Sequence, residues 1–169
     1  ASLSGLAEVL GYSAVYSGTL IKKFTGKSFS AFLQEKRCEY AAEMLEKTEG
    51  KDCFFLVLDG IEDPHNLGAI IRTAEAAGAH GVIIPKRRSA SLNATVAKSA
   101  CGALEYMKVA RVTNIPNTID ELKEKGIWVF GADMDGDDYT KTDYSSPTAI
   151  VIGNEGKGIG RLVRENCDG

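Results

Sequence analysis

The sequence predicts an α/β protein, a parallel β-sheet with helices on both faces, preceded by a small all-α segment. From about residue 51, short apolar runs alternate with segments of helical periodicity, and short connections join them. This alternation is typical of a parallel sheet whose helical crossovers cover both faces. The first 50 residues follow another pattern, helix, tight turn and helix. We therefore expect two segments, a helical one over 1–50 and an α/β one over 51–169.

Composition limits the class of protein. The 169 residues are 44% hydrophobic and carry a net charge of −3, so the chain can build a core but has no global attraction to nucleic acid. The four cysteines and two histidines show no metal-ligand spacing, which favours a reduced, cytoplasmic setting and no metal. No apolar run approaches the roughly 18 residues of a membrane span, and no signal peptide is evident, so no membrane association is expected.

Helical periodicity organises the first segment. Leu3–Leu10 has helical apolar spacing, and Gly11 breaks it. Ser13 can cap a second helix that runs through Leu20–Phe24. A longer helix is predicted over Phe29–Lys47.

The α/β segment begins with a strand, a turn and a helix. Phe54–Leu58 is apolar, rich in β-formers and too short for an ordinary helix, so it predicts a buried strand. After a polar turn, Asn66 is placed to cap a helix over Leu67–Ala77, with Gly78 as its stop. Asn66 and Arg72 then lie near the carboxyl end of a buried strand, where open α/β sheets bind their ligands.

The middle of the chain continues the alternation. Three further strands are predicted, at Ala79–Pro85, Tyr106–Val112 and Ile127–Ala132. Two helices are predicted between them, at Leu92–Gly102 and Ile115–Gly126. The acidic stretch at 133–138 lacks the twelfth-position Glu and the flanking helices of a calcium loop, so a solvated turn is expected there.

A glycine-rich loop follows the last predicted strand. Thr148–Ile152 is a second buried apolar run, and a short helix is predicted over Arg161–Asn166. Between them, the loop Gly153–Gly160 contains four glycines, which allow close approach of the backbone to a ligand. Its spacing fits neither the dinucleotide fingerprint nor the P-loop, so NAD and ATP are poor candidates.

Two of these stretches carry a family resemblance. They are D-G-I-E-D-P-H-N-L-G-A-I-I-R-T-A-E-A-A-G at 59–78 and I-V-I-G-N-E-G-K-G-I at 150–159. They resemble the first and second motifs of the SpoU (TrmH) family of the SPOUT superfamily. Members are RNA ribose 2′-O-methyltransferases that use S-adenosyl-L-methionine, and their cofactor site is a trefoil knot in the backbone. G-V-I-I-P-K-R-R at 81–88 and S-L-N-A-T-V-A-K-S-A-C-G-A at 91–103 resemble the branch that methylates a guanosine of 23S ribosomal RNA.

The resemblance implies a catalytic group of three residues. The family assigns activation of the ribose hydroxyl to the first-motif arginine, here Arg72. Because arginine is an unlikely general base, its expected role is to bind phosphate and stabilise the developing oxyanion. Asn66 and Glu155 are expected to position Arg72 and the substrate. The alternative for Glu155 is a carboxylate that favours the N-terminus of the following helix.

The resemblance also implies where cofactor and RNA bind. The main chain around Gly153, Asn154 and Gly158 is expected to hold S-adenosyl-L-methionine, with a further contact from the chain leaving the fourth strand at Ala132. RNA is expected to bind the basic patch Lys86-Arg87-Arg88, although composition alone favours a solvated loop there.

In the family, a further strand, a third motif and a final helix follow the part that this chain resembles. The sequence stops at Gly169, so we expect a C-terminally truncated chain with an incomplete knot. One wall of the cofactor site would then be missing, together with the helix through which these homodimers form.

The first segment carries a second, shorter resemblance. L-A-E-V-L-G-Y-S at 6–13 and K-K-F-T-G-K-S-F at 22–29 resemble the first of two helix-turn-helix units in AraC-type transcription regulators. The second unit is missing, and Gly18 and Thr19 offer little with which to read a DNA groove. Two alternatives to the enzyme therefore stay open: a DNA-binding fragment acting through residues 1–47, or an inert mosaic of two unrelated pieces.

Overall fold

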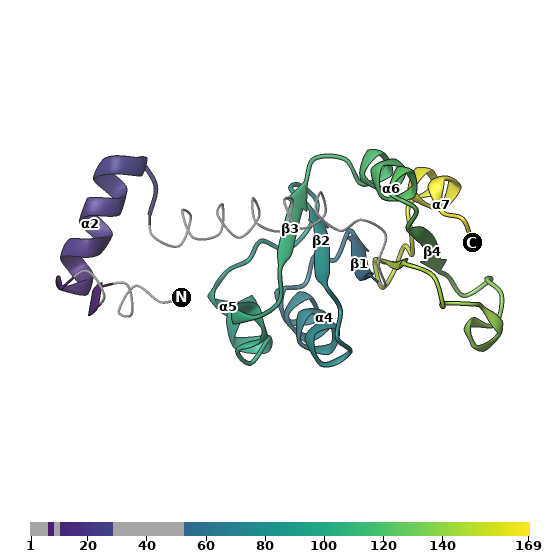
Figure 1. The fold of residues 1–169 in the computed structure, drawn as a ribbon, viewed down its shortest axis with the longest axis horizontal. Helices are drawn as coiled ribbons and strands as arrows, with labels where there is room; N and C mark the ends of the chain where they lie inside the picture. The colour runs from purple at the N-terminus through teal and green to yellow at the C-terminus, as the bar shows by residue number, and fades with distance from the viewer. Residues whose placement is uncertain (1–6, 9–10, 29–52) are drawn as a thin grey trace.

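A five-stranded sheet forms the centre of the computed structural model, which describes residues 7–8, 11–28 and 53–169. All paired neighbours run parallel. The order across the sheet is β3-β2-β1-β5-β4, and Figure 1 shows β3, β2 and β1 side by side. The strands are β1 (Phe54–Asp59), β2 (Gly81–Pro85), β3 (Val109–Val112), β4 (Trp128–Ala132) and β5 (Thr148–Gly153).

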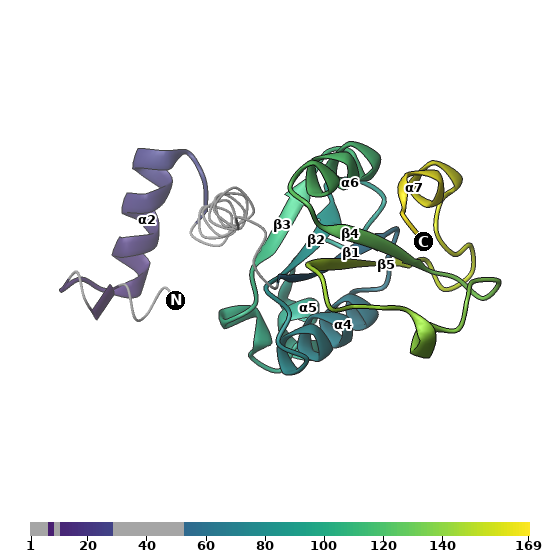
Figure 2. The ribbon, with the colours of Figure 1, turned by 45° about the vertical axis from the view of Figure 1, so that its right-hand side comes forward.

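Helices cover both faces of this sheet, which confirms the predicted fold class (Figures 1 and 2). On one face lie α4 (Pro64–Ala76), α5 (Ala94–Ser99) and the short 3₁₀ helix η1 (Ala103–Glu105). On the other lie α6 (Ile115–Glu124) and α7 (Arg161–Asn166). A second 3₁₀ turn, η2 (Tyr139–Lys141), belongs to the loop between β4 and β5.

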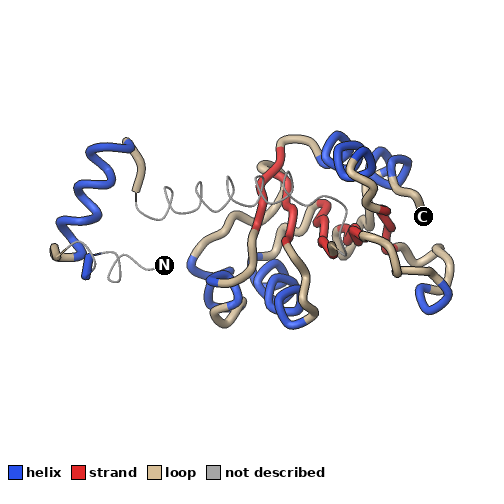
Figure 3. The backbone as a smooth tube through the Cα atoms, viewed as in Figure 1, coloured by secondary structure: helices blue, strands red, loops and turns tan. Residues whose placement is uncertain are grey.

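The central strands are mainly apolar, and most of their residues are buried. Successive residues of β1 point to opposite sides. Phe55 and Val57 join the core under α6 and α7, whereas Leu56 and Leu58 join the core under α4 and α5. The sheet therefore lies between two hydrophobic layers, and the tube view shows helices on both sides of the strands (Figure 3). It is a rigid support for the loops that leave its strands.

Helix α4 begins earlier than the sequence predicted. Asp63 is its N-cap, and its side chain accepts a hydrogen bond of 2.7 Å from the N–H of His65. Pro64 takes the first helical position, where its missing N–H costs nothing and its fixed φ suits a helix. The prediction that Asn66 caps this helix was wrong, because Asn66 lies inside the first turn.

Three other predicted elements were too long. The N–H of Ala79 still bonds the carbonyl of Ala74 in α4, so β2 begins after it. The N–H of Met107 bonds the carbonyl of Ala103, so β3 also begins later than predicted. The predicted helix over 92–102 is confined to α5, which ends at Ser99.

In the first segment, the cap prediction at Ser13 is confirmed. Its Oγ accepts from the N–H of Tyr16 at 3.2 Å and begins α2 (Ala14–Thr25), which ends at Gly26 with φ +71°. The helix predicted over 29–47 lies outside the described residues, as does most of the one predicted over 3–10. None of the described helices has the length and apolarity needed to cross a membrane.

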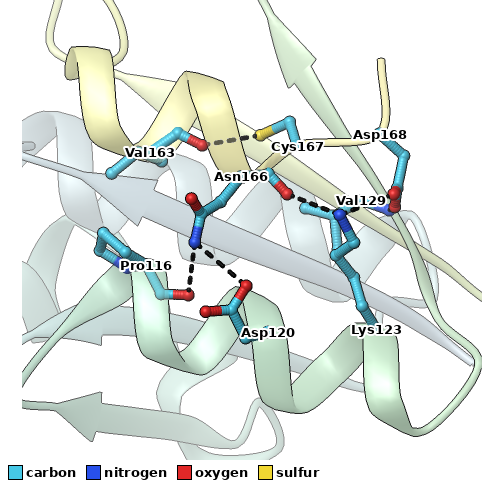
Figure 4. A network of polar contacts seen from close by, with 8 residues as sticks. All are labelled: Pro116, Asp120, Lys123, Val129, Val163, Asn166, Cys167 and Asp168. Carbon is cyan, nitrogen blue, oxygen red and sulfur yellow. Dashed lines mark hydrogen bonds and ion pairs between the residues drawn. The ribbon is translucent and has the colours of Figure 1, made fainter.

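The C-terminal turn of the chain is tied to α6 and β4 (Figure 4). The N–H of Asp168 bonds the carbonyl of Val129 at 2.7 Å, and Lys123 Nζ lies 2.9 Å from Asp168 Oδ1. Asn166 Nδ2 donates to Asp120 Oδ1 at 3.1 Å. These contacts fix α7, and with it one end of the loop that precedes α7.

Candidate active site at the carboxyl ends of β1 and β5

The direction of the chain across the sheet reverses between β1 and β5. From β1 the chain proceeds to β2 and β3 on one side, then returns through β4 and β5 on the other. The register pairs Asp59 with Gly153, so the last residues of the two strands lie side by side. A reversal of this kind leaves a crevice beyond the strand ends, where open α/β sheets bind ligands.

Two side chains tie the loops after these strands together. Asp59 Oδ2 accepts a hydrogen bond from the N–H of Gly160 at 2.8 Å. Asn154 Nδ2 donates to the carbonyl of Gly60 at 2.9 Å. The turn after β1 and the glycine loop, residues 153–160, therefore form one joined structure.

The glycine loop closes on itself at a point where side chains do not fit. Asn154 and Gly158 exchange two backbone hydrogen bonds, of 3.0 and 2.8 Å. A Cβ atom at Gly153 would lie 2.2 Å from the carbonyl carbon of Gly158, too close for any other residue. Gly158 has φ +66°, a conformation that favours glycine. The loop thus presents bare backbone beside the end of β1.

Asn154 holds this loop through its whole amide group. Its Oδ1 accepts from the N–H groups of Gly156 at 2.9 Å and Lys157 at 3.2 Å, in addition to the bond that its Nδ2 makes to Gly60. Sequence reasoning proposed only its main chain as a ligand-binding group. The structure adds a structural role for its side chain.

We expect Asn154→Ala to lower the free energy of unfolding by about 1–3 kcal/mol, because three hydrogen bonds with net values near 1 kcal/mol are lost together. Urea unfolding measures this. Asn117→Ala, at an exposed helical position, is the matched control and should stay within about 0.5 kcal/mol of the wild type. An Asn154 variant as stable as that control would contradict the assigned role.

Asn66 and Glu155 meet across the crevice. Asn66 Nδ2 donates to Glu155 Oε1 at 2.5 Å, which joins the first turn of α4 to the glycine loop. A carboxylate accepting from an amide is a charge-assisted hydrogen bond, stronger than a neutral one. Two of the three predicted catalytic residues therefore lie in contact, although they are far apart in the sequence.

Arg72 lies on another side of α4. Six residues separate it from Asn66, which at about 100° per residue places the two side chains roughly 120° apart around the helix. The Arg72 side chain is exposed, and its Nη1 lies 3.8 Å from Cys101 Sγ, in the turn after α5. The described contact of the guanidinium is with Cys101 and not with the glycine loop, so the placement of the Arg72 side chain at the rim beside that loop stays a prediction.

The close packing of α4 on α5 was not predicted. A Cβ atom at Gly68 would lie 2.5 Å from the Cβ of Ser99, so the two helices can approach only because residue 68 is glycine. His65 Nδ1 lies 3.0 Å from Ser99 Oγ, one further contact in this interface. The sequence signal was Gly68 inside an otherwise helical pattern, which often marks a close contact.

The remaining predicted site residues lie around this edge. Lys86, Arg87 and Arg88 are exposed in the loop between β2 and α5. Ala132 ends β4, and the next residue, Asp133, forms an ion pair with Arg164 of α7. Among the described residues, no group of His, Cys, Asp or Glu is arranged to hold a metal ion.

The cysteines differ in accessibility. Cys101 is exposed, Cys53 is buried, and burial raises the pKa of the Cys167 thiol to about 11. Because the thiolate is the nucleophile, we expect iodoacetamide at pH 8 to alkylate Cys101 well before Cys53 and Cys167. Peptide mapping by mass spectrometry measures the order. Faster modification of Cys167 would show that its surroundings are more open than the structure indicates.

Fold and loop geometry together define an α/β protein with a candidate ligand site, formed by exposed loop backbone, at the switch point of a parallel sheet. Residues 53–169 match the family model described as the SpoU rRNA Methylase family, and the chain belongs to that family. The match begins just before β1 and includes every residue of the site described above.

Curated relatives agree with this assignment. The chain is 51% identical over 149 residues to YacO of Bacillus subtilis, whose name places it in the TrmH family of tRNA/rRNA methyltransferases. That alignment covers 85% of this chain and 60% of YacO. A Staphylococcus haemolyticus protein of the same family name is 58% identical over 114 residues, which is 67% of this chain and 46% of the relative. The chain thus spans about half to three-fifths of these relatives.

Solved structures show the same fold. The SpoU methyltransferase AviRb from Streptomyces viridochromogenes, in complex with the cofactor AdoMet, is 31% identical with a TM-score of 0.65. The superposition covers 69% of this chain and 46% of AviRb. An AdoMet-bound rRNA methyltransferase from Sinorhizobium meliloti is 28% identical with a TM-score of 0.66, over 73% of this chain and 48% of that one.

Proposed function

We propose that the protein that carries this chain transfers a methyl group from S-adenosyl-L-methionine to a ribose 2′-hydroxyl of RNA. The observation that supports this best is the junction of the two family motifs, where Asn66 of α4 contacts Glu155 of the glycine loop at 2.5 Å. The family match supports the reaction class. AviRb, which shares the fold and is 31% identical in sequence, was solved in complex with AdoMet.

The residues present fit such a cofactor. At Gly158 nothing lies within 4 Å of the place of a Cβ atom, whereas at Gly153 the backbone of Gly158 fills that place and so closes the loop; the Asn154 side chain keeps the loop in position. In this proposal Gly153, Asn154, Gly158 and Ala132 hold the cofactor. When bound, S-adenosyl-L-methionine supplies a methyl group attached to a sulfonium.

The catalytic part of the proposal concerns the attacking ribose. A hydroxyl is a poor nucleophile near neutral pH and needs stabilisation as it loses its proton. Arg72 supplies a fixed positive charge for the phosphate and the developing alkoxide. Asn66 and Glu155, held together at the first turn of α4, fix that helix relative to the glycine loop and so position Arg72.

The substrate that we propose is a guanosine of 23S ribosomal RNA, bound in part by Lys86, Arg87 and Arg88. The names of the relatives support RNA in general, since they give both tRNA and rRNA. We further propose a division of the chain near residue 50, because the family match begins at residue 53. A homodimer, which the resemblance implies, belongs to the same proposal. No observation on the described residues favours DNA binding by residues 1–47.

Transfer of labelled methyl groups to transcripts of 23S ribosomal RNA and tRNA tests the proposal. We expect label in the 23S transcript, recovered after nuclease digestion as 2′-O-methylguanosine. Label in tRNA alone would show that the substrate is tRNA, the other RNA that the names of the relatives give, and not 23S ribosomal RNA. Absence of label from both RNAs, with a cofactor-loaded and folded protein, would overturn the proposed function.

A further inference from the structure

We propose that Arg111 is a positioning residue for RNA binding: it holds the cationic loop, residues 86–88, in the conformation that contacts RNA phosphates. This inference rests on the proposed function, because it presumes an RNA substrate. Arg111 itself, in the edge strand β3, does not contact the RNA in this proposal.

The charges around the site make this loop important. Three carboxylates lie close together in the chain here, Asp59 at the end of β1 and Glu62 and Asp63 in the turn before α4. An acidic turn repels phosphate, and the whole chain has a net charge of −3. The three consecutive cations of the cationic loop oppose that charge at the same edge of the sheet, so RNA binding there should depend on where these cations are held.

The cationic loop is anchored at its first residue by β3. The N–H of Lys86 donates to the carbonyl of Val112 at 2.8 Å. Arg111 Nη2 donates to the carbonyl of Lys86 at 3.3 Å. Both polar groups of the Lys86 backbone are therefore held by neighbouring residues of one strand, and the Arg111 bond is the one that depends on a side chain.

The other end of the loop is anchored to the turn after β1. The N–H of Ala90 donates to the carbonyl of Ile61 at 2.8 Å, and Ser89 Oγ donates to the same carbonyl at 3.2 Å. Between the anchors, Arg88 has φ +58°, which is uncommon for a residue other than glycine. Such a conformation persists where the surroundings enforce it, and the two anchors do so.

The surroundings of Arg111 indicate a positioning role. Arg111 is half-buried, and its Nε lies buried without a hydrogen-bond partner among the described residues. The protein encloses its Nε, and its Nη2 donates to the Lys86 carbonyl. Lys86, Arg87 and Arg88 are exposed and free to approach phosphates.

A double-mutant cycle tests this in the whole protein. Arg111→Met keeps the apolar stem and removes the donor. Its affinity for a fluorescein-labelled RNA hairpin is compared with those of the wild type, of the loop variant K86A/R87A/R88A, and of the two changes combined. We expect Arg111→Met alone to weaken RNA binding about tenfold. The slope of log affinity against log salt concentration should also become shallower, by more than the roughly 0.7 that one single-strand phosphate contact contributes.

In the loop variant, the same Arg111→Met change is expected to alter affinity less than about twofold, because the residues it positions are gone. Ser89→Ala, which weakens the other anchor, should behave in the same way. Lys141→Ala removes an exposed cation in η2 and should leave binding unchanged. Circular dichroism and thermal unfolding establish that each variant is folded.

An equal loss in both backgrounds would overturn the inference, because Arg111 would then contact RNA itself or act through the whole fold. Wild-type affinity in the single variant would overturn it as well. Methyl transfer by the wild type decides the proposed function separately. If the wild type methylates RNA while the cycle shows no coupling, only the inference about Arg111 fails.

Discussion

Replacing Arg72 by alanine is expected to lower single-turnover methyl transfer about 10²–10³-fold, the usual loss when one donor to a developing oxyanion is removed. The guanidinium carries a positive charge and a planar pair of donors, so it can stabilise the alkoxide as negative charge develops. Transfer is measured with labelled cofactor and saturating RNA. Arg72→Lys should recover only part of the rate, because an ammonium keeps the charge but loses the planar pair of donors.

Arg161→Ala is the matched control for Arg72. Arg161 is another exposed arginine near the same edge of the sheet, and its described contact is an ion pair of 3.0 Å with Glu165 one helical turn away. Its loss should leave the rate unchanged. If the Arg72 and Arg161 variants were equally active, Arg72 would have no role in the reaction.

Gly153→Ala is expected to abolish measurable cofactor binding. The added methyl group would lie 2.2 Å from the carbonyl carbon of Gly158, where only backbone can yield, so the glycine loop must open. Forced overpacking of this kind also costs about 1–3 kcal/mol of stability. Calorimetric titration with S-adenosyl-L-methionine measures the first effect, and urea unfolding measures the second.

Gly156→Ala provides the comparison within the same loop. A Cβ atom there would lie 3.6 Å from Asn154 Oδ1, an ordinary contact, and the Gly156 N–H that bonds Asn154 is retained. Its stability should therefore match that of the wild type. Normal cofactor binding by the Gly153 variant would show that the loop has more freedom than its geometry implies.

The sequence was sufficient to predict the sheet and the faces that its helices cover. Strands buried on both faces must be mainly apolar. The runs Phe54–Leu58 and Thr148–Ile152 have this composition, and both form strands. The α7 helix was predicted with its observed bounds, because glycine precedes it and an apolar run ends before the loop. Family resemblance added the expectation that the main chain of the glycine loop holds the cofactor.

The contacts that build the site could not be predicted from local pattern. Asp59 bonds Gly160, and Asn154 bonds Gly60, across about a hundred residues of sequence. Such pairs depend on strand order, which periodicity does not specify. The cap of α4 was misassigned because both Asp63 and Asn66 are good capping residues, and Pro64 decided in favour of Asp63.

The direction in which the Arg72 side chain points depends on how α4 is rotated about its axis, which local sequence pattern does not specify. Its contact with Cys101 depends on the approach of α5, which in turn requires glycine at position 68. Neither the pairing of these helices nor the role of Arg111 in holding Lys86 has a signature in the sequence. Both emerge only when the elements are assembled.

The central claim is that the loops after β1 and β5 together form the cofactor site. Backbone amide NMR shifts during titration with S-adenosyl-L-methionine test it most directly. We predict saturable shifts at Gly60, Gly153 and Gly158. The amino ends of the same strands border a separate pocket, lined in part by Cys53 and Thr148. Shifts confined to that pocket, with the three glycines unmoved, would contradict the account.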